Sequence, residues 1–235
     1  MIAIEKKILY EDNHLIILNK APSDIVQGDK TGDKPLSESV KDYLKEKYNK
    51  PGEVFLGVVH RLDRPVSGVV IFAKTSKALS RMNEMLREGA LQKKYWAIVA
   101  DKPEPEEATL IDFLKKNEQQ NKSFVVKNKS EGAKEARLSY KLLACSDRYY
   151  LLEVELHTGR HHQIRAQLAH NGTPIKGDLK YGFSTSNKDA SISLHARQVS
   201  FPHPVKKESM TVIVPPPDET LWNYFSSGLG TTNQE

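Results

Sequence analysis

The stretch HRLDRPVSGVVIFAK, residues 60–74, decides the fold because a charged turn leads directly into an uninterrupted apolar run. Residues 67–74 (SGVVIFAK) predict a buried strand. Residues 77–88 follow with Leu79, Met82 and Leu86 at helical spacing, which predicts a helix. Ser76 is placed to cap that helix and Gly89 to end it, so this stretch predicts a strand and an amphipathic helix.

Short strand patterns continue on both sides of this stretch. They cover residues 7–10, 14–19, 95–100, 138–145, 149–156, 192–201 and 210–214. Helical patterns cover residues 37–48 and 161–170. Many short strands with few helices predict an α+β domain around a mostly antiparallel sheet.

Three stretches lack such patterns. Residues 21–35 are rich in Gly, Pro, Asp and Ser and predict a loop. Residues 101–132 are polar and predict a long mobile excursion with room for one short strand. The small polar residues 226–235 predict a disordered tail, which leaves one domain over residues 1–225.

The composition is that of an ordinary globular protein, with 38% hydrophobic and 28% charged residues and no apolar run long enough to cross a bilayer. The single cysteine, Cys145, excludes an intramolecular disulfide and is expected to be a small buried side chain. We therefore expect a cytoplasmic protein without a membrane partner. The net charge of +5 favours acidic partners such as nucleic acid, although many basic proteins bind none.

The charged turn places one carboxylate, Asp63, among His60, Arg61 and Arg64 just before the buried strand. Nearby positive charge keeps a carboxylate ionised. Two interpretations of this pattern stay open. It is either a surface ion-pair cluster that closes a turn, or a reactive carboxylate held in its charged form.

Residues 157–165 (HTGRHHQIR) place cationic side chains around the start of a predicted helix. Because a helix N-terminus attracts anions, this segment predicts an anion or phosphate site. The histidines also suggest a metal site, but no Cys or carboxylate stands at ligand spacing. Arg160 and Arg165 would repel a cation, so we expect no metal.

Residues 93–96 (KKYW) place two lysines before two aromatic residues at the start of a predicted strand. Aromatic faces stack on nucleobases and lysines bind phosphates, so this segment predicts a nucleic-acid contact. An ordinary strand with one inward aromatic side chain fits the same pattern equally well.

Taken in order, these motifs resemble the RluA-type pseudouridine synthases over nearly the whole chain. The pair HRLD and TGR-x-HQIR, in this order, is the most specific part of the resemblance. The chain starts directly at the region that resembles the catalytic domain, so we expect no N-terminal S4 RNA-binding domain. The matching segments are residues 10–22 (YEDNHLIILNKAP), 60–68 (HRLDRPVSG), 93–99 (KKYWAIV), 158–182 (TGRHHQIRAQLAHNGTPIKGDLKYG) and 194–204 (LHARQVSFPHP).

The chain departs from the family pattern at a few positions. Val66 and His161 stand where the family commonly has Thr, and Gln167 stands where it often has His. The segment KAPSDIVQG, residues 20–28, replaces the more usual Lys–Pro–Ala–Gly turn. These departures bear on substrate choice rather than on the chemistry.

The resemblance implies an isomerase that converts a specific uridine of a structured RNA into pseudouridine without a cofactor, after base flipping. The RNA would be large-subunit rRNA, tRNA or both. Asp63 is the implied catalytic carboxylate, acting as nucleophile or as base, and Arg165 would pair with it. Tyr95 would stack on the uracil and is a candidate for handling the C5 proton, while Ile164 would form an apolar wall.

Further residues are expected to contact the RNA or to support the catalytic loop. Arg61 would fill the space that the flipped base leaves, and His60 would hold the loop. The other expected RNA contacts are Arg64, Lys93, Lys94, Arg160, His162 and Gln163. The implied fold is a mixed, mostly antiparallel sheet that is split by a central RNA-binding cleft and flanked by helices, in a monomer.

Two alternatives come from other functional classes. A non-catalytic RNA-binding or ribosome-assembly protein could keep the fold, although it would not need the set Asp63, Tyr95 and Arg165. A metal-dependent phosphohydrolase or nuclease built on the histidines would contain bound metal.

Overall fold

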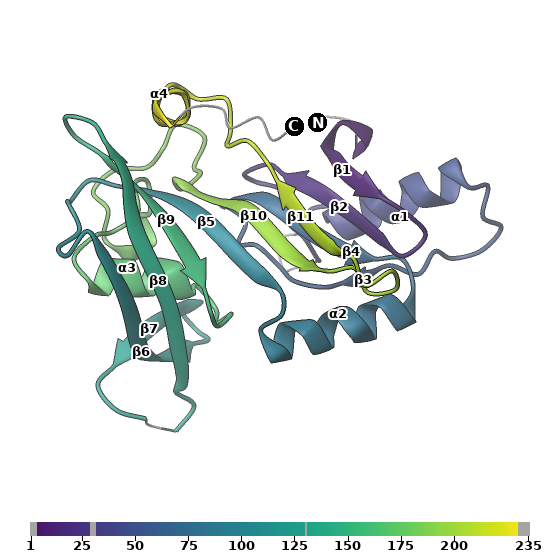
Figure 1. The fold of residues 1–235 in the computed structure, drawn as a ribbon, viewed down its shortest axis with the longest axis horizontal. Coiled ribbons are helices and arrows are strands. Elements are labelled where there is room, and N and C mark those ends of the chain that lie inside the picture. The colour runs from purple at the N-terminus through teal and green to yellow at the C-terminus, as the bar shows by residue number, and fades with distance from the viewer. Residues whose placement is uncertain (1–3, 29–31, 130, 230–235) are drawn as a thin grey trace. The chain divides into compact units, whose positions relative to one another are not determined.

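The computed structural model describes residues 4–28, 32–129 and 131–229. Its elements, labelled in Figure 1, fall into two compact units. The single domain predicted over residues 1–225 stays a prediction. Unit 1 comprises the chain up to Gln92 together with residues 196–215, and unit 2 comprises residues 93–195 and the chain from Pro216.

Unit 1 is built on antiparallel strand pairs. In it β2 pairs with β1 and β4, β3 pairs with β4, β10 neighbours β4, and β11 pairs with β10. The strands are β1 (Ile8–Glu11), β2 (Leu15–Lys20), β3 (Gly57–Val58), β4 (Ser67–Ala73), β10 (Leu194–Pro202) and β11 (Ser209–Ile213). Its helical elements are η1 (Ile4–Lys7), α1 (Leu36–Lys47) and α2 (Ser76–Glu88).

The strand and helix predicted from residues 60–89 are confirmed. Every residue of β4 is buried, and Met82 of α2 is 0% exposed in a core cluster with residues of β2, β4 and β10. The helix ends at Gly89, whose φ of 74° is left-handed. Its cap is Thr75 rather than the predicted Ser76, because the Thr75 hydroxyl accepts from the Ala78 N–H.

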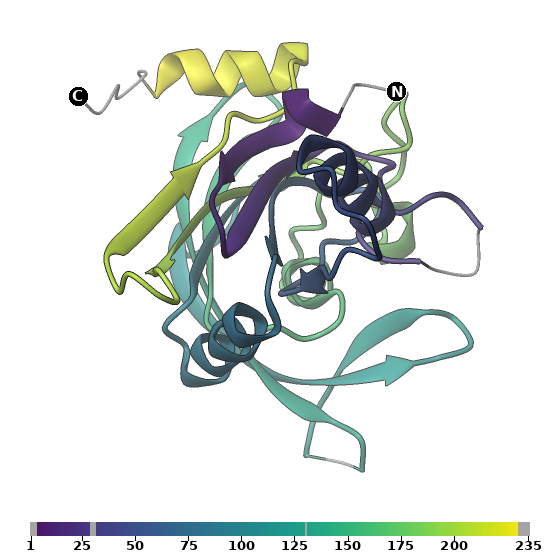
Figure 2. The ribbon, with the colours of Figure 1, turned by 90° about the vertical axis from the view of Figure 1, so that its right-hand side faces the viewer.

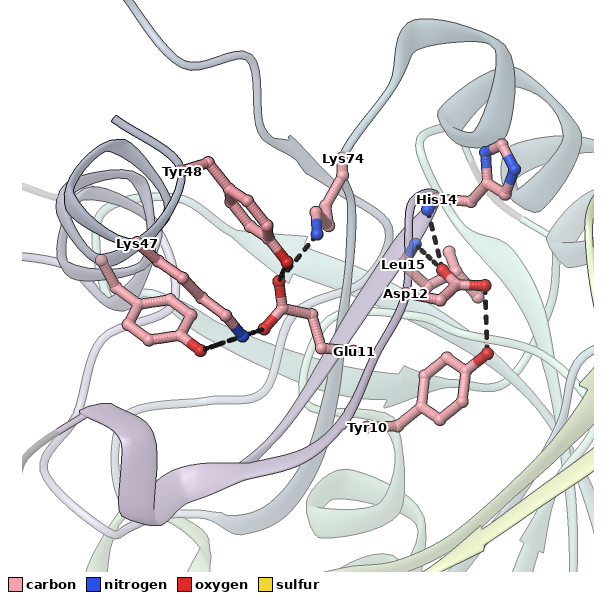
Figure 3. Close-up of polar contacts among 9 residues, drawn as sticks. Tyr10, Glu11, Asp12, His14, Leu15, Lys47, Tyr48 and Lys74 are labelled. Carbon is pink, nitrogen blue, oxygen red and sulfur yellow. Dashed lines mark hydrogen bonds and ion pairs between the residues drawn. The ribbon is translucent and has the colours of Figure 1, made fainter. Parts of the chain in front are cut away.

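The end of β1 is held by two carboxylates that point to different partners (Figure 3). Glu11 accepts hydrogen bonds from Lys47 and Tyr48 at the C-terminal end of α1, and from Lys74 after β4 ends. Asp12 accepts from the backbone N–H groups of His14 and Leu15, which shapes the turn into β2. These contacts join β1, α1 and β4 of unit 1.

His203, in the segment LHARQVSFPHP, is also part of the scaffold of unit 1. Its Nε2 lies 2.9 Å from the Asp12 carboxylate, and its Nδ1 accepts from the N–H groups of Val205 and Lys206. Because Nδ1 accepts twice, the neutral ring carries its proton on Nε2 and donates it to Asp12. The β1–β2 turn and the β10–β11 turn are thereby tied together.

Unit 2 is built on five strands in the order β5-β9-β8-β6-β7, and every printed pair is antiparallel. The strands are β5 (Gln92–Val99), β6 (Glu107–Asn117), β7 (Lys122–Val126), β8 (Lys134–Cys145) and β9 (Tyr150–Leu156). Its helical elements are α3 (Gln163–His170), η2 (Leu179–Tyr181) and α4 (Thr220–Gly228).

The register assigns the two faces of this sheet. Tyr95 of β5 lies opposite Val154 of β9, which lies opposite Tyr140 of β8, so these three side chains share a face. Ala136 lies on that face too, and it packs against Ala166 of α3. Helix α3 therefore covers the face that carries Tyr95.

Helix α4 covers the opposite face. Trp96 and Ile98, which alternate with Tyr95 along β5, form a buried cluster with Trp222 and Phe225 of α4. The neighbouring residues Tyr95 and Trp96 of β5 thus lie on opposite faces of the sheet, Tyr95 on the face that α3 covers and Trp96 on the face that α4 covers.

Three predictions for unit 2 were wrong. Residues 101–132, predicted to be a mobile excursion with room for one short strand, contain two paired strands, the β6–β7 hairpin, drawn in teal at the lower right of Figure 2. Residues 226–228, predicted to belong to a disordered tail, form the last turn of α4, while residues 230–235 lie outside the described residues. Cys145 is exposed at the end of β8 rather than buried. In the described part of the chain, no helix has the length and apolarity needed to cross a membrane.

Candidate active site

Asp63 lies half-buried in the loop between β3 and β4 of unit 1. The Val66 N–H donates to the Asp63 carbonyl at 3.0 Å, which closes a turn just before β4. Gly68 follows with a φ of 118°, and a Cβ atom there would stand 2.3 Å from the carbonyl oxygen of Ala196. Only glycine fits this approach to β10, so the loop enters the sheet along one path.

The buried Lys20 holds this loop from behind. Its side chain is 0% exposed, and its Nζ donates to the carbonyls of Ala21 at 3.1 Å, Arg64 at 3.0 Å and Val66 at 2.6 Å. Burial lowers the pKa of Lys20 to about 7, against the opposing effect of Asp24 and Asp63. The carbonyl contacts use all three N–H groups of an ammonium, so Lys20 fixes the backbone on both sides of Pro65.

The residues that flank Asp63 differ in their surroundings. Arg61 is exposed and His60 is half-buried. Arg64 is also exposed, and its Nη2 lies 2.6 Å from the Asp33 carboxylate. An exposed ion pair of this kind contributes little to stability.

Strand β5 separates the two lysines of the KKYW motif. Lys94 pairs with Glu153 of β9 at 2.8 Å, on the face that α4 covers. Lys93 shares the face of Tyr95, and its Nζ would lie 3.6 Å from a Cβ atom built on Gly159. Burial lowers the pKa of Lys93. Tyr95 itself is only 6% exposed.

Gln163 organises the turn that precedes α3. Its Oε1 accepts from the Thr158 hydroxyl at 2.7 Å and from the Arg160 N–H at 3.0 Å, and its Nε2 donates to the Arg137 carbonyl at 3.1 Å. Both ends of this buried amide bind the protein, so Gln163 positions the turn. Its predicted contact with RNA stays a prediction. The side chain of the exposed Arg160 is oriented by a hydrogen bond from its Nε to the Glu135 carbonyl at 2.7 Å.

The two histidines before α3 form a stacked pair. The rings of His161 and His162 lie 3.8 Å apart, and His162 is buried with a left-handed φ of 53°. The Nδ1 of His161 lies 2.9 Å from the Ser123 hydroxyl, and that of His162 lies 3.0 Å from the Tyr181 hydroxyl. Across the described residues, no group of three His, Cys, Asp or Glu side chains is arranged to hold a metal ion.

Arg165 is held on two sides within unit 2. Its Nε and Nη2 donate to the two carboxylate oxygens of Asp178 at 2.7 and 2.9 Å, and both side chains are almost fully buried. The guanidinium carbon also lies 5.0 Å from the centre of the Tyr181 ring. Asp178 thus binds one edge of the guanidinium through two parallel hydrogen bonds.

The predicted site residues fall into both units. Those in unit 1 are His60, Arg61, Asp63 and Arg64. Those in unit 2 are Lys93, Lys94, Tyr95, Arg160, His162, Gln163, Ile164 and Arg165. Ile164 is 5% exposed on α3, next to Arg165. The pairing of Arg165 with Asp63 joins residues of different units and stays a prediction.

Residues 14–170, which include the Asp63 loop, Tyr95 and Arg165, match the family model described as RNA pseudouridylate synthase. The chain belongs to this family. A ribosomal large subunit pseudouridine synthase C from Haemophilus ducreyi is 36% identical over 222 residues, which cover 90% of this chain and 66% of that protein. A tRNA pseudouridine synthase C from Vibrio parahaemolyticus is 31% identical and is matched over 91% of its length. The chain thus spans about two thirds of the large-subunit relatives and nearly all of the tRNA relative.

Solved structures of the pseudouridylate synthase family confirm the fold. Human RNA Pseudouridylate Synthase Domain Containing 4 aligns over 97% of this chain and 94% of its own, with a TM-score of 0.79 at 23% identity. Human RNA Pseudouridylate Synthase Domain Containing 1 aligns with a TM-score of 0.72 at 21% identity. The predicted α+β class with mostly antiparallel strands is therefore confirmed.

Three supporting residues had no predicted role. Lys20, Asp178 and Tyr181 all lie inside the quoted motifs, but nothing in their local sequence indicates what they contact. Lys20 reaches carbonyls 44 and 46 residues away, and Asp178 binds an arginine 13 residues before it. A charged residue inside an apolar segment, such as Lys20 at the end of HLIILNK, was the only available signal.

Proposed function

We propose that this protein is an RNA pseudouridine synthase that uses Asp63 to isomerise a uridine of a structured RNA. The observation that carries the proposal is the HRLD loop, which lies inside the family match and is held by the buried side chain of Lys20. A protein that only binds RNA would not need a carboxylate on a loop fixed in this way.

The reaction moves one bond and leaves the composition of the RNA unchanged. The N1–C1′ bond breaks, and the uracil leaves with the bonding electrons. The base then turns and C5 bonds to C1′. The proton on C5 is lost to a base, and N1 takes up a proton. No electron is gained or lost overall, so the isomerisation needs neither a redox partner nor a group donor.

In this proposal, the residues of both units have separate tasks. Asp63 acts at the ribose, either by attacking C1′ or by removing the 2′ hydrogen. Tyr95 stacks on the uracil, and its phenol is the candidate for moving the C5 proton. Arg165 pairs with the Asp63 carboxylate through its guanidinium.

The substrate class follows from the relatives rather than from the site. Their names refer to the ribosomal large subunit and to tRNA. We therefore propose large-subunit rRNA or tRNA as the substrate of this chain. A monomeric enzyme of the cytoplasm, as predicted from the sequence, belongs to the same proposal, and sedimentation and cell fractionation test it.

Release of tritium from RNA labelled at uridine C5 tests the proposal directly. Unmodified tRNA and large-subunit rRNA transcripts are incubated with wild type or Asp63→Asn, with a chelator present and without cofactor. We expect wild type to release tritium from one of these RNAs. Asp63→Asn should release none while its RNA affinity stays within about threefold, because the change keeps the shape and removes the charge.

Asp147→Asn is the matched control, because Asp147 is an exposed carboxylate in a turn. It should behave as wild type. Substantial turnover by Asp63→Asn would refute Asp63 as the catalyst. RNA binding by wild type without tritium release from either transcript would favour the non-catalytic RNA-binding protein.

A further inference from the structure

One face of the β6–β7 hairpin is apolar and open. Ile111, Phe113 and Lys115 alternate along β6 and point to one side of the sheet. In the antiparallel register, Phe124 of β7 lies opposite Lys115, and Val126 lies opposite Phe113. Ile111 is 61% exposed and Phe124 is 40% exposed. An exposed aromatic and aliphatic surface of this kind on a sheet is typical of a binding site.

Positive side chains border these apolar residues. Arg137 of β8 lies opposite Ile111. Lys122 stands at a register position of the same face of β7, and its Nζ lies at the strand edge, 5.2 Å from the centre of the Phe124 ring and 4.9 Å from that of Tyr181. Lys115 adds a third positive charge. Glu135, which lies opposite Phe113, adds one negative charge to the same area. We call this surface the hairpin face: Ile111, Phe113, Lys115, Lys122, Phe124, Val126 and Arg137.

The other side of the same strands is already packed. Leu114 of β6 and Ala136 of β8 lie in a buried cluster with Ala166 of α3 and Tyr181. Helix α4 packs on the hairpin-face side of the sheet, but its buried cluster draws on β5 and β9, through Trp96 and Leu151. The hairpin face is therefore beyond the cover of α4.

The hairpin is also fixed within unit 2. The Tyr181 hydroxyl accepts from the Ser123 N–H at 2.9 Å and lies 3.2 Å from the Ser123 carbonyl, so it caps the edge strand β7. Lys180 donates to the carbonyls of Gln120 and Asn121 in the hairpin turn. The Tyr181 ring also contacts the guanidinium of Arg165. The hairpin face is thus held in a set position relative to Arg165.

We propose that the hairpin face binds single-stranded nucleotides of the RNA substrate. Bases stack on Phe124 and the neighbouring apolar side chains, and phosphates bind Lys115, Lys122 and Arg137. A sheet that displays an aromatic ring among cations suits RNA, because every base offers a flat apolar surface and every nucleotide a negative charge. The proposal rests on the proposed function only for the choice of RNA as the partner.

A uridine-free oligonucleotide separates binding from turnover. The probe is a fluorescein-labelled single-stranded oligoadenylate of about 12 nucleotides, within the usual site size of such surfaces, and binding is followed by fluorescence anisotropy. We expect Phe124→Ala to weaken binding about tenfold, because a stacking base is lost. Lys115→Met should lower the slope of log affinity against log salt by about 0.7.

Two matched variants serve as controls. Tyr224→Ala removes an aromatic side chain of α4 that is 56% exposed, and Lys188→Met removes an exposed lysine of unit 2. Neither lies on the hairpin face, so both should bind the oligoadenylate as wild type does. Circular dichroism melting shows that each variant is folded before its affinity is compared.

The proposal is overturned if folded Phe124→Ala binds like wild type, or if wild type does not bind the oligoadenylate. It is also overturned if wild type sediments as a dimer that Ile111→Ser dissociates, since the face would then contact a second copy. Tritium release by the same preparations tests the synthase separately. Release by wild type with unchanged binding by Phe124→Ala overturns the hairpin proposal alone, and Phe124-dependent binding without release overturns the synthase alone.

Discussion

At the scale of single residues, the contact between Arg165 and Asp178 combines a structural and a proposed catalytic role. Both side chains are nearly excluded from water, so each charge depends on the other. Asp178→Asn should lower the free energy of unfolding by about 3 kcal/mol, because a buried guanidinium then faces a neutral amide. Urea unfolding followed by circular dichroism measures this loss.

The double variant Arg165→Met with Asp178→Leu is the informative comparison. Removing both charges leaves no uncompensated charge in the core, so the double variant should be more stable than Asp178→Asn. It should nevertheless be inactive in tritium release, because the guanidinium proposed to serve Asp63 is gone. If Asp178→Asn is as stable as wild type, the two hydrogen bonds between Arg165 and Asp178 contribute little to the stability of the fold.

Lys93 and Lys94 give a second prediction at this scale. Both were predicted to bind phosphate, but Lys94 is paired with Glu153, whereas Lys93 lies against the Gly159 turn on the face of Tyr95. Lys93→Met should reduce the salt slope of RNA binding by about 0.7–0.9, as expected for one lost phosphate contact. Lys94→Met should change it much less, because phosphate near Lys94 would also approach a carboxylate. Equal slopes for the two variants would contradict this assignment.

At the scale of elements, Glu11 joins β1, α1 and β4 of unit 1 (Figure 3). Burial raises its pKa, but hydrogen bonds from Lys47, Lys74 and two tyrosines outweigh burial and lower the pKa to about 2. Since the folded pKa lies below the unfolded one, this stabilisation is complete above about pH 5 and is lost as the pH falls toward 2.

Glu11→Gln should therefore cost roughly 2 kcal/mol in the free energy of unfolding at pH 7. The difference from wild type should shrink between pH 5 and pH 2, because protonation removes the same charge from wild type. Urea unfolding at pH 7, 4 and 3 measures it. Glu46→Gln, at an exposed position of α1, is the control and should differ little at any pH. If the stability difference between Glu11→Gln and wild type did not depend on pH, the charge of Glu11 would not be what stabilises its contacts with α1 and Lys74.

The secondary-structure elements differ in how well sequence patterns predict them. Strand β4 and helix α2 were predictable because their apolar residues follow one period and face one core. The β6–β7 hairpin was not predictable in this way. One face of its strands is exposed, and the polar run KNEQQNK at its turn interrupts any apolar pattern. The roles of Lys20, Gln163 and Asp178 depend on contacts that only the folded chain creates, so their motifs could indicate importance but not partners.

At the scale of the whole molecule, the predicted catalytic set is divided between two compact units. Asp63 belongs to unit 1, with its loop held by Lys20, and Arg165 belongs to unit 2, with its guanidinium held by Asp178. Each unit thus prepares its own half of the predicted pair. The resemblance to the family predicts that the two residues act together, and a double-mutant cycle can measure that coupling directly.

Asp63→Asn, Arg165→Lys and the double variant are compared with wild type in single-turnover tritium release. Arg165→Lys alone should lose at least about a hundredfold in rate, because a point charge cannot replace a planar fork at a buried pair. If the two residues act as one unit, the double variant should be no slower than Asp63→Asn, as groups that share one task are strongly non-additive. Independent, multiplicative losses would show that Arg165 serves the reaction through contacts of unit 2, such as Asp178 and Tyr181, rather than through Asp63.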